Sequence, residues 1–113
     1  MDFQETFRDL GTAVTAYVPL KAEADMKEAL ARSTEMERDQ AFERMHVVVG
    51  DRSRYTLAEL GAITTEFLKL APAAIATRAL AEEARAVADQ AFRQVCAVQN
   101  VIDERLDGTR DAA

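Results

Sequence analysis

The chain lacks most of the residues on which catalytic and metal sites depend. Its 113 residues include no Trp, one Cys and one His. One cysteine cannot form an intrachain disulfide or a cysteine zinc cluster. The chain also has no Gly-rich phosphate loop and no Ser-His-Asp set. These absences exclude the common enzyme classes, and we expect no cofactor, no metal and no catalytic residue.

Long apolar runs and a targeting signal are also missing. No stretch approaches the roughly 18 apolar residues of a membrane span. Three acidic residues (Asp2, Glu5 and Asp9) fall where a secretory signal would be basic or apolar. We therefore expect a soluble cytoplasmic protein with no membrane partner. The excess of Arg over Lys is typical of a GC-rich bacterial genome.

Positive charge is scarce. There are 20 acidic against 14 basic residues, a net charge of -6. A protein that follows nucleic-acid phosphates needs a basic face. A capped helix followed by a second helix over 56–77 resembles a helix-turn-helix motif, but the range has one basic residue, Lys69, and no amide side chains to read bases. We therefore expect no nucleic-acid partner.

Glycine and proline divide the chain into expected segments. They delimit four helical segments (2–18, 20–48, about 56–71 and 73–106) and a polar loop (50–55). The sequence has no evident internal repeat. Pro19 is expected to end or kink the first helix, and Pro72 to break or open the last. Val47–Val49 is β-branched and could be extended. Asp2 with Glu5, and Thr56 with Glu59, predict N-terminal caps.

The apolar residues predict an all-α fold. Two stripes at helical spacing run along the first and last segments, and consist of Phe3, Phe7, Leu10, Val14 and Tyr17, and of Leu80, Ala84, Val87, Ala91, Val95, Val98 and Ile102. Two of the helices are too long for a compact monomer of this size. We predict a four-helix bundle with two long helices, completed by homodimerisation, with a single domain over 1–107 and a frayed tail over 108–113.

The only imidazole permits three interpretations. Glu43 and His46 lie on one side of a helix, as in di-iron bundles, where a symmetric dimer would supply a second pair and Glu59 or Glu66 would complete the site. His46-Val-Val-Val-Gly50 resembles the H-x-x-x-G centre of histidine phosphotransfer domains, which implies an exposed phosphate-accepting imidazole. That family has a basic residue where this chain has Val49. Otherwise His46 is structural, near a helix C-terminus.

Other polar groups have ordinary interpretations. Cys96, on an apolar helix, is expected to be a small core residue. Glu82, Glu83 and Asp89 have arginines at helical spacing and predict a solvated ion-pair face. Arg52 and Arg54 flank Ser53 and precede Tyr55, and an aromatic with two arginines in a loop can contact a partner.

These patterns together predict a non-catalytic helical interaction protein. It would act as an adaptor, an assembly or secretion chaperone, an inhibitor or a structural subunit, with a protein partner and a tendency to form homo-oligomers. Arg52, Arg54 and Tyr55 are the expected partner-binding residues. The alternative is a site centred on His46, either histidine phosphotransfer or metal binding by Glu43 and His46 across a dimer.

Overall fold

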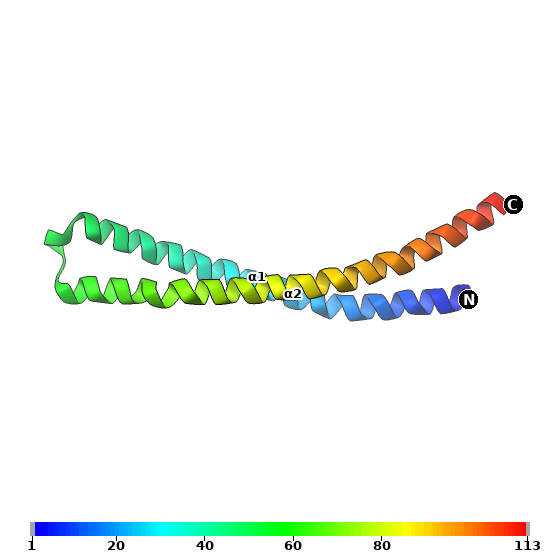
Figure 1. Cartoon of the computed structure of the whole chain (residues 1–113), viewed down its shortest axis with the longest axis horizontal. Helices are drawn as coiled ribbons and strands as arrows, with labels where there is room; N and C mark the ends of the chain where they lie inside the picture. The colour runs from blue at the N-terminus through cyan, green and yellow to red at the C-terminus, as the bar shows by residue number, and fades with distance from the viewer. Residues whose placement is uncertain (1, 113) are drawn as a thin grey trace. The chain divides into compact units, whose positions relative to one another are not determined.

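The computed structural model describes residues 2–112, with side chains described as far as Gly108. Helix α1 spans Phe3–Gly50 and helix α2 spans Leu57–Ala112, and the 3-10 turn η1 (Arg52–Arg54) lies between them (Figure 1). No strand occurs within the described residues. The all-α prediction is confirmed, but the chain has two long helices in place of four segments.

Both prolines lie inside helices, so neither ends nor opens a helix as predicted, and the alternative that Pro19 kinks its helix stays a prediction. Pro19 is within α1 and Pro72 within α2. Proline removes one backbone hydrogen bond, which frees the carbonyl four residues earlier. Those carbonyls belong to Thr15 and Leu68, and all four residues are exposed. Water can therefore satisfy the freed carbonyls, and the helices continue.

The segment Val47–Val49 is helical and not extended, because α1 continues to Gly50. Val48 is buried, and packing outweighs the weak helix propensity of β-branched residues. Both predicted caps are confirmed. The Glu5 backbone N–H donates to Asp2 Oδ1 at 2.8 Å, and the Glu59 N–H donates to Thr56 Oγ1 at 3.2 Å.

The chain forms two compact units, each an antiparallel pair of helical stretches. Unit 1 joins residues 2–25 to residues 83–112, and unit 2 comprises residues 26–82 with the loop. In unit 1, Tyr17 meets Phe92; in unit 2, Phe42 meets Phe67. α2 is helical to Ala112, and the fraying expected beyond residue 107 stays a prediction.

The residues between the helices recur at alternating intervals of three and four, the spacing of a coiled-coil seam. In α1 these seam positions are Phe3, Thr6, Leu10, Ala13, Tyr17, Leu20, Ala24, Lys27, Ala31, Thr34, Arg38, Ala41, Met45 and Val48. In α2 they are Leu60, Ile63, Phe67, Leu70, Ala74, Thr77, Ala81, Ala84, Ala88, Ala91, Val95, Val98, Ile102 and Arg105. All of them are buried or half-buried.

Alanine, more than the larger apolar residues, fills the tightest part of this seam. Ala24 and Ala31 are fully buried, and Ala74 and Ala81 nearly so. The predicted stripes are therefore partly displaced. Phe7, Val14, Leu80 and Val87 were expected in the core, but each is at least 39% exposed.

Candidate interaction surface

Large apolar side chains cover much of the outside of both helices. Each of the following is at least half exposed: Phe7, Val18, Met26, Leu30, Met36, Phe42, Val47, Val49, Leu57, Leu68, Ile75 and Leu80. Single exposed apolar residues are ordinary on a monomer. A density of this kind along helices is typical of surfaces that contact another protein.

Arg78 forms the strongest polar link between α1 and α2 in unit 2. Its Nε and Nη2 donate to the two carboxylate oxygens of Glu35 at 3.1 and 2.5 Å. Its Nη1 donates to Glu28 Oε2 at 2.6 Å, and Glu28 also accepts from Arg32 at 3.0 Å. Two carboxylates one heptad apart therefore share one guanidinium, which fixes the helix register.

These contacts change the acidity of the groups involved. The hydrogen bond from Arg78 lowers the pKa of Glu28 and of Glu35. The same hydrogen bonds raise the pKa of Arg78. Burial pulls each pKa the other way, but hydrogen bonding to the opposite charge is the larger cause and decides the direction. The cluster is therefore ionised at neutral pH and has a structural role.

Unit 1 has a smaller version of this arrangement. Arg85 Nη2 donates to Asp25 Oδ1 at 2.8 Å, and Lys21 Nζ donates to Asp25 Oδ2 at 3.1 Å. The pKa of Asp25 is lowered, chiefly by the hydrogen bond from Arg85. Near the chain ends, the Arg105 guanidinium lies over the Phe3 ring at 5.6 Å. Unit 1 therefore also has polar links on the edge of an apolar seam.

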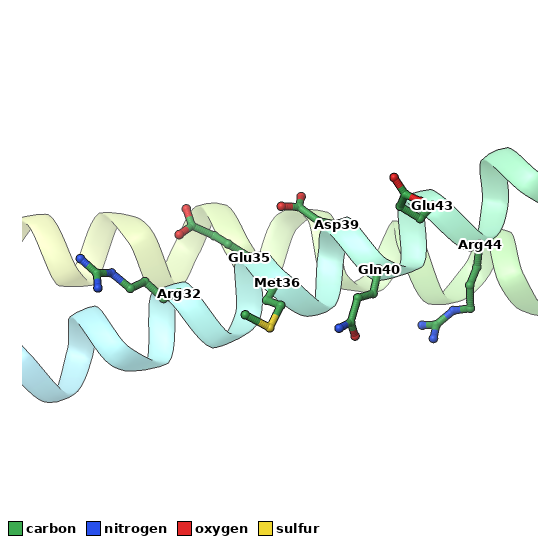
Figure 2. A pocket seen from close by; sticks show the side chains of 7 residues that line it. All are labelled: Arg32, Glu35, Met36, Asp39, Gln40, Glu43 and Arg44. Carbon is green, nitrogen blue, oxygen red and sulfur yellow. The ribbon is translucent and has the colours of Figure 1, made fainter.

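A hollow of about 740 Å³ lies on α1. Figure 2 shows that all seven lining side chains come from this one helix, with Glu35, Asp39 and Glu43 on one edge and Met36, Gln40 and Arg44 on the other. The hollow is therefore open space between side chains of one helix surface. An open surface of this kind suits protein contact better than enclosure of a small molecule.

The proposed metal pair lies on the exposed side of α1. Glu43 and His46 are both exposed, and the His46 ring stacks on Phe42 with centroids 6.3 Å apart. Within the part of the chain that the structure describes, no three His, Cys, Asp or Glu side chains are grouped for a metal. The two further candidates have other partners: Glu66 pairs with Arg44 at 2.8 Å, and Glu59 caps α2.

The loop residues expected to bind a partner are mostly accessible. Arg52 is exposed, and Arg54 pairs with Asp51 at 2.9 Å while remaining exposed. Tyr55 is half-buried and helps to line a hollow of about 360 Å³ with Val47 and Ile63. Their role in partner binding stays a prediction.

The other polar residues singled out from the sequence do not form a site. Cys96 is half-buried, and Glu82, Glu83 and Asp89 are exposed. Arg78 and Arg85 reach carboxylates on α1, and Arg93 donates to Gln90 at 3.0 Å.

Sequence reasoning missed this link between α1 and α2, because spacing along one helix cannot show which acid of the other helix lies opposite. The signal that could have found it is the heptad spacing of Glu28 and Glu35 on α1, which lets one arginine of the other helix, Arg78, reach both carboxylates.

Neither helix, over the described residues, has a stretch apolar enough to cross a membrane. A cytoplasmic location stays a prediction. Comparison with known proteins leaves the fold and the surface as the only guides to function: the chain matches no protein-family model, no curated protein and no solved structure.

Proposed function

We propose that this chain is a non-catalytic helical interaction protein, acting as an adaptor, chaperone, inhibitor or structural subunit. The observation that carries the proposal is the set of large apolar side chains that stay at least half exposed on both helices. Leu30 and Leu80, each at least half exposed, are examples. Burial of such side chains against a partner is favourable by about 25 cal/mol per Å² of apolar surface.

A second copy of the chain is one proposed partner. Two antiparallel helix pairs, packed through their exposed apolar faces, would form a four-helix bundle. The net charge of -6 is spread among exposed acidic and basic residues, so an uncharged contact face would keep like charges apart.

Binding to a protein partner is tested by comparing the wild-type chain with a variant that replaces Leu30→Gln and Leu80→Gln. Partners are captured from the host, identified, purified and bound again in isolation. We expect the purified partner to bind the wild-type chain and to bind the variant more weakly at equal helicity. A His46→Ala variant is expected to bind as the wild type does. Loss of binding in His46→Ala with the fold intact would contradict the proposal.

Chemistry at His46 is the second candidate function. The imidazole is exposed near the end of α1, as a phosphate-accepting or metal-binding histidine requires. Native mass spectrometry of protein from its own host distinguishes the two candidates. A phosphoryl adduct or a bound metal ion that disappears in His46→Ala would favour this second function over the first.

A further inference from the structure

The two helices are related by an internal duplication with an offset of 50 residues, which corrects the expectation of no repeat. Residues 1–50 and 51–100 share identical residues at 14 of the 50 aligned positions. The longest matches are 29–31 with 79–81 (Ala-Leu-Ala in both) and 39–42 with 89–92 (Asp-Gln-Ala-Phe in both). The segments 9–11 and 59–61 also correspond, as Asp-Leu-Gly and Glu-Leu-Gly.

The structure gives equivalent residues equivalent surroundings. Tyr17 corresponds to Phe67, and Phe42 corresponds to Phe92. The Tyr17–Phe92 rings in unit 1 lie 5.4 Å apart, and the Phe42–Phe67 rings in unit 2 lie 5.7 Å apart. Each unit therefore pairs the first half of one repeat with the second half of the other. Seam residues also correspond, because Ala24 and Ala31 match Ala74 and Ala81.

Each unit carries the same uncharged face beside its seam. The residues of face 1, in unit 1, are Phe7, Gly11, Val14, Val18 and Phe92. The residues of face 2, in unit 2, are Leu57, Gly61, Thr64, Leu68 and Phe42, the equivalents of those of face 1. Every one of them is exposed, and Phe42 and Phe92 are exposed to nearly the same extent, 50% and 49%.

Ion pairs show that the residues of each face, which come from both helices, lie on one side of their unit. In unit 2, Arg78 lies on α2 three heptads after Leu57. Glu35 lies on α1 one heptad before Phe42. Arg78 and Glu35 are hydrogen-bonded to each other. In unit 1, Arg85 lies one heptad before Phe92, and Asp25 lies one heptad after Val18; these are bonded as well. Residues one heptad apart share a side of a helix.

Glycine at the same place in both faces indicates close approach by another molecule. Gly11 and Gly61 are inside helices, where glycine is less favourable than alanine. A Cβ atom built on either glycine meets nothing within 4 Å, and neither glycine has a positive φ. Nothing within the described chain requires glycine there, whereas a helix packing closely across the face would.

We propose that face 1 and face 2 are the two halves of a homodimer interface, each covered by a face of a second copy of this chain. This inference rests on the proposed self-association and locates it. Within one chain, each repeat already packs antiparallel against the other. Phe92 of face 1 and Phe42 of face 2 also contact rings of the seam, those of Tyr17 and Phe67. Both faces are uncharged, which suits contact between two copies that each carry a net charge of -6.

The exposed area is sufficient for such an interface. The chain exposes 8187 Å², whereas a compact monomer of 12.5 kDa exposes about 6,200 Å². A standard interface takes about 800 Å² from each partner. The chain therefore exposes about 2,000 Å² more than a compact monomer of its mass, and this difference exceeds what one standard contact removes from a partner.

Filling the two glycine positions tests the proposal. The variant Gly11→Leu/Gly61→Leu adds side chains where the chain itself has open space, so it keeps or increases helicity. The matched control is Ala29→Leu/Ala79→Leu, an equivalent pair of exposed alanines outside both faces. Sedimentation equilibrium and light scattering give the association constant, and circular dichroism gives the helicity.

We expect the wild-type chain and the alanine control to be dimers, and the glycine variant to associate at least about tenfold more weakly. Equal association of all three proteins would overturn the assignment of the faces and leave the proposed function standing. A wild-type chain that stays monomeric at high concentration would overturn self-association itself, while binding to another protein remains separately testable. If the leucine variant loses helicity, Val18→Lys/Leu68→Lys takes its place with the same expected result.

Discussion

The guanidinium of Arg78 on α2 and the carboxylate of Glu35 on α1 form a two-point ion pair between the helices. The Nε–Oε2 distance is 3.1 Å and the Nη2–Oε1 distance is 2.5 Å. Both side chains are less than a third exposed. A planar guanidinium has the geometry to bind a carboxylate in this way, and lysine does not. The pair therefore fixes the register of the helices in unit 2.

Replacing Arg78 is expected to lower the melting temperature at neutral pH and to make the melting temperature depend less on pH. The lowered pKa values of Glu28 and Glu35 mean that these groups stabilise the fold above their unfolded pKa values, and that this stability is lost as the pH falls through their folded pKa values. The wild-type melting temperature should fall as the pH is lowered from neutral toward 3. For Arg78→Met it should start lower at neutral pH and fall less.

Thermal melts followed by circular dichroism at several pH values measure this effect. Arg93→Met is the matched control, because Arg93 donates to the neutral Gln90. If Arg78→Met and Arg93→Met have the same melting temperatures at every pH, the Arg78 cluster does not stabilise the fold.

Enlarging a buried alanine is expected to force the helices of unit 2 apart. Ala81 is 2% exposed in the seam, and the extra methyl groups of Ala81→Leu would overfill a packed interior. We expect a loss of about 1–3 kcal/mol in the free energy of unfolding, measured by urea denaturation. Ala79→Leu places the same side chain on the exposed side of α2 and should change stability little. Equal stability of the two variants would contradict the assigned seam.

Replacing the prolines is expected to stabilise the helices. Pro19→Ala and Pro72→Ala each restore a backbone donor inside a helix, and proline is about 3 kcal/mol less favourable than alanine in a helix interior. Since the freed carbonyls belong to Thr15 and Leu68, which are exposed, we expect a gain below that limit. Urea denaturation of the two variants measures it. A decrease in stability in either variant would contradict this expectation.

Reversing the charges of α1 is expected to disrupt the pairing of α1 with α2. In the variant Glu28→Arg/Glu35→Arg, three arginines would face one another, because Arg78 bonds to both Glu28 and Glu35. We expect lower helicity and a lower melting temperature by circular dichroism. The further change Arg78→Glu should restore both. Failure of this rescue would show that the charges are not used to select the partner helix.

Local rules predicted the parts of the fold that depend on nearby residues. The caps at Asp2 and Thr56 were predicted because acceptor and donor lie three residues apart. The helices themselves followed from apolar spacing. The local sequence does not show whether a proline ends a helix, because that depends on whether the surroundings satisfy the freed carbonyl and accommodate the ring. Whether Thr15 and Leu68 face water depends on where the other helix lies.

The core was harder to predict than the helices. Phe7 and Phe3 both fit a helical stripe, but only Phe3 lies at a seam position. The seam follows the alanines, whose small size lets the helices approach, and hydrophobicity alone ranks Phe7 and Leu80 above Ala13 and Ala81. Dividing the chain at glycine and proline also hid the duplication, because neither proline has an equivalent in the other repeat.

The duplication has a consequence for how the chain avoids mispairing. Two helices of similar sequence have similar seams, so α1 of one molecule could pair with α1 of another. The duplicates differ in charge at Glu28 and Glu35, whose counterparts are Arg78 and Arg85. Pairing of like helices would bring acids against acids or bases against bases, which is unfavourable. After duplication, a helix sequence able to pair with itself has thus become two helices with opposite charges at these positions, and these helices recognise each other.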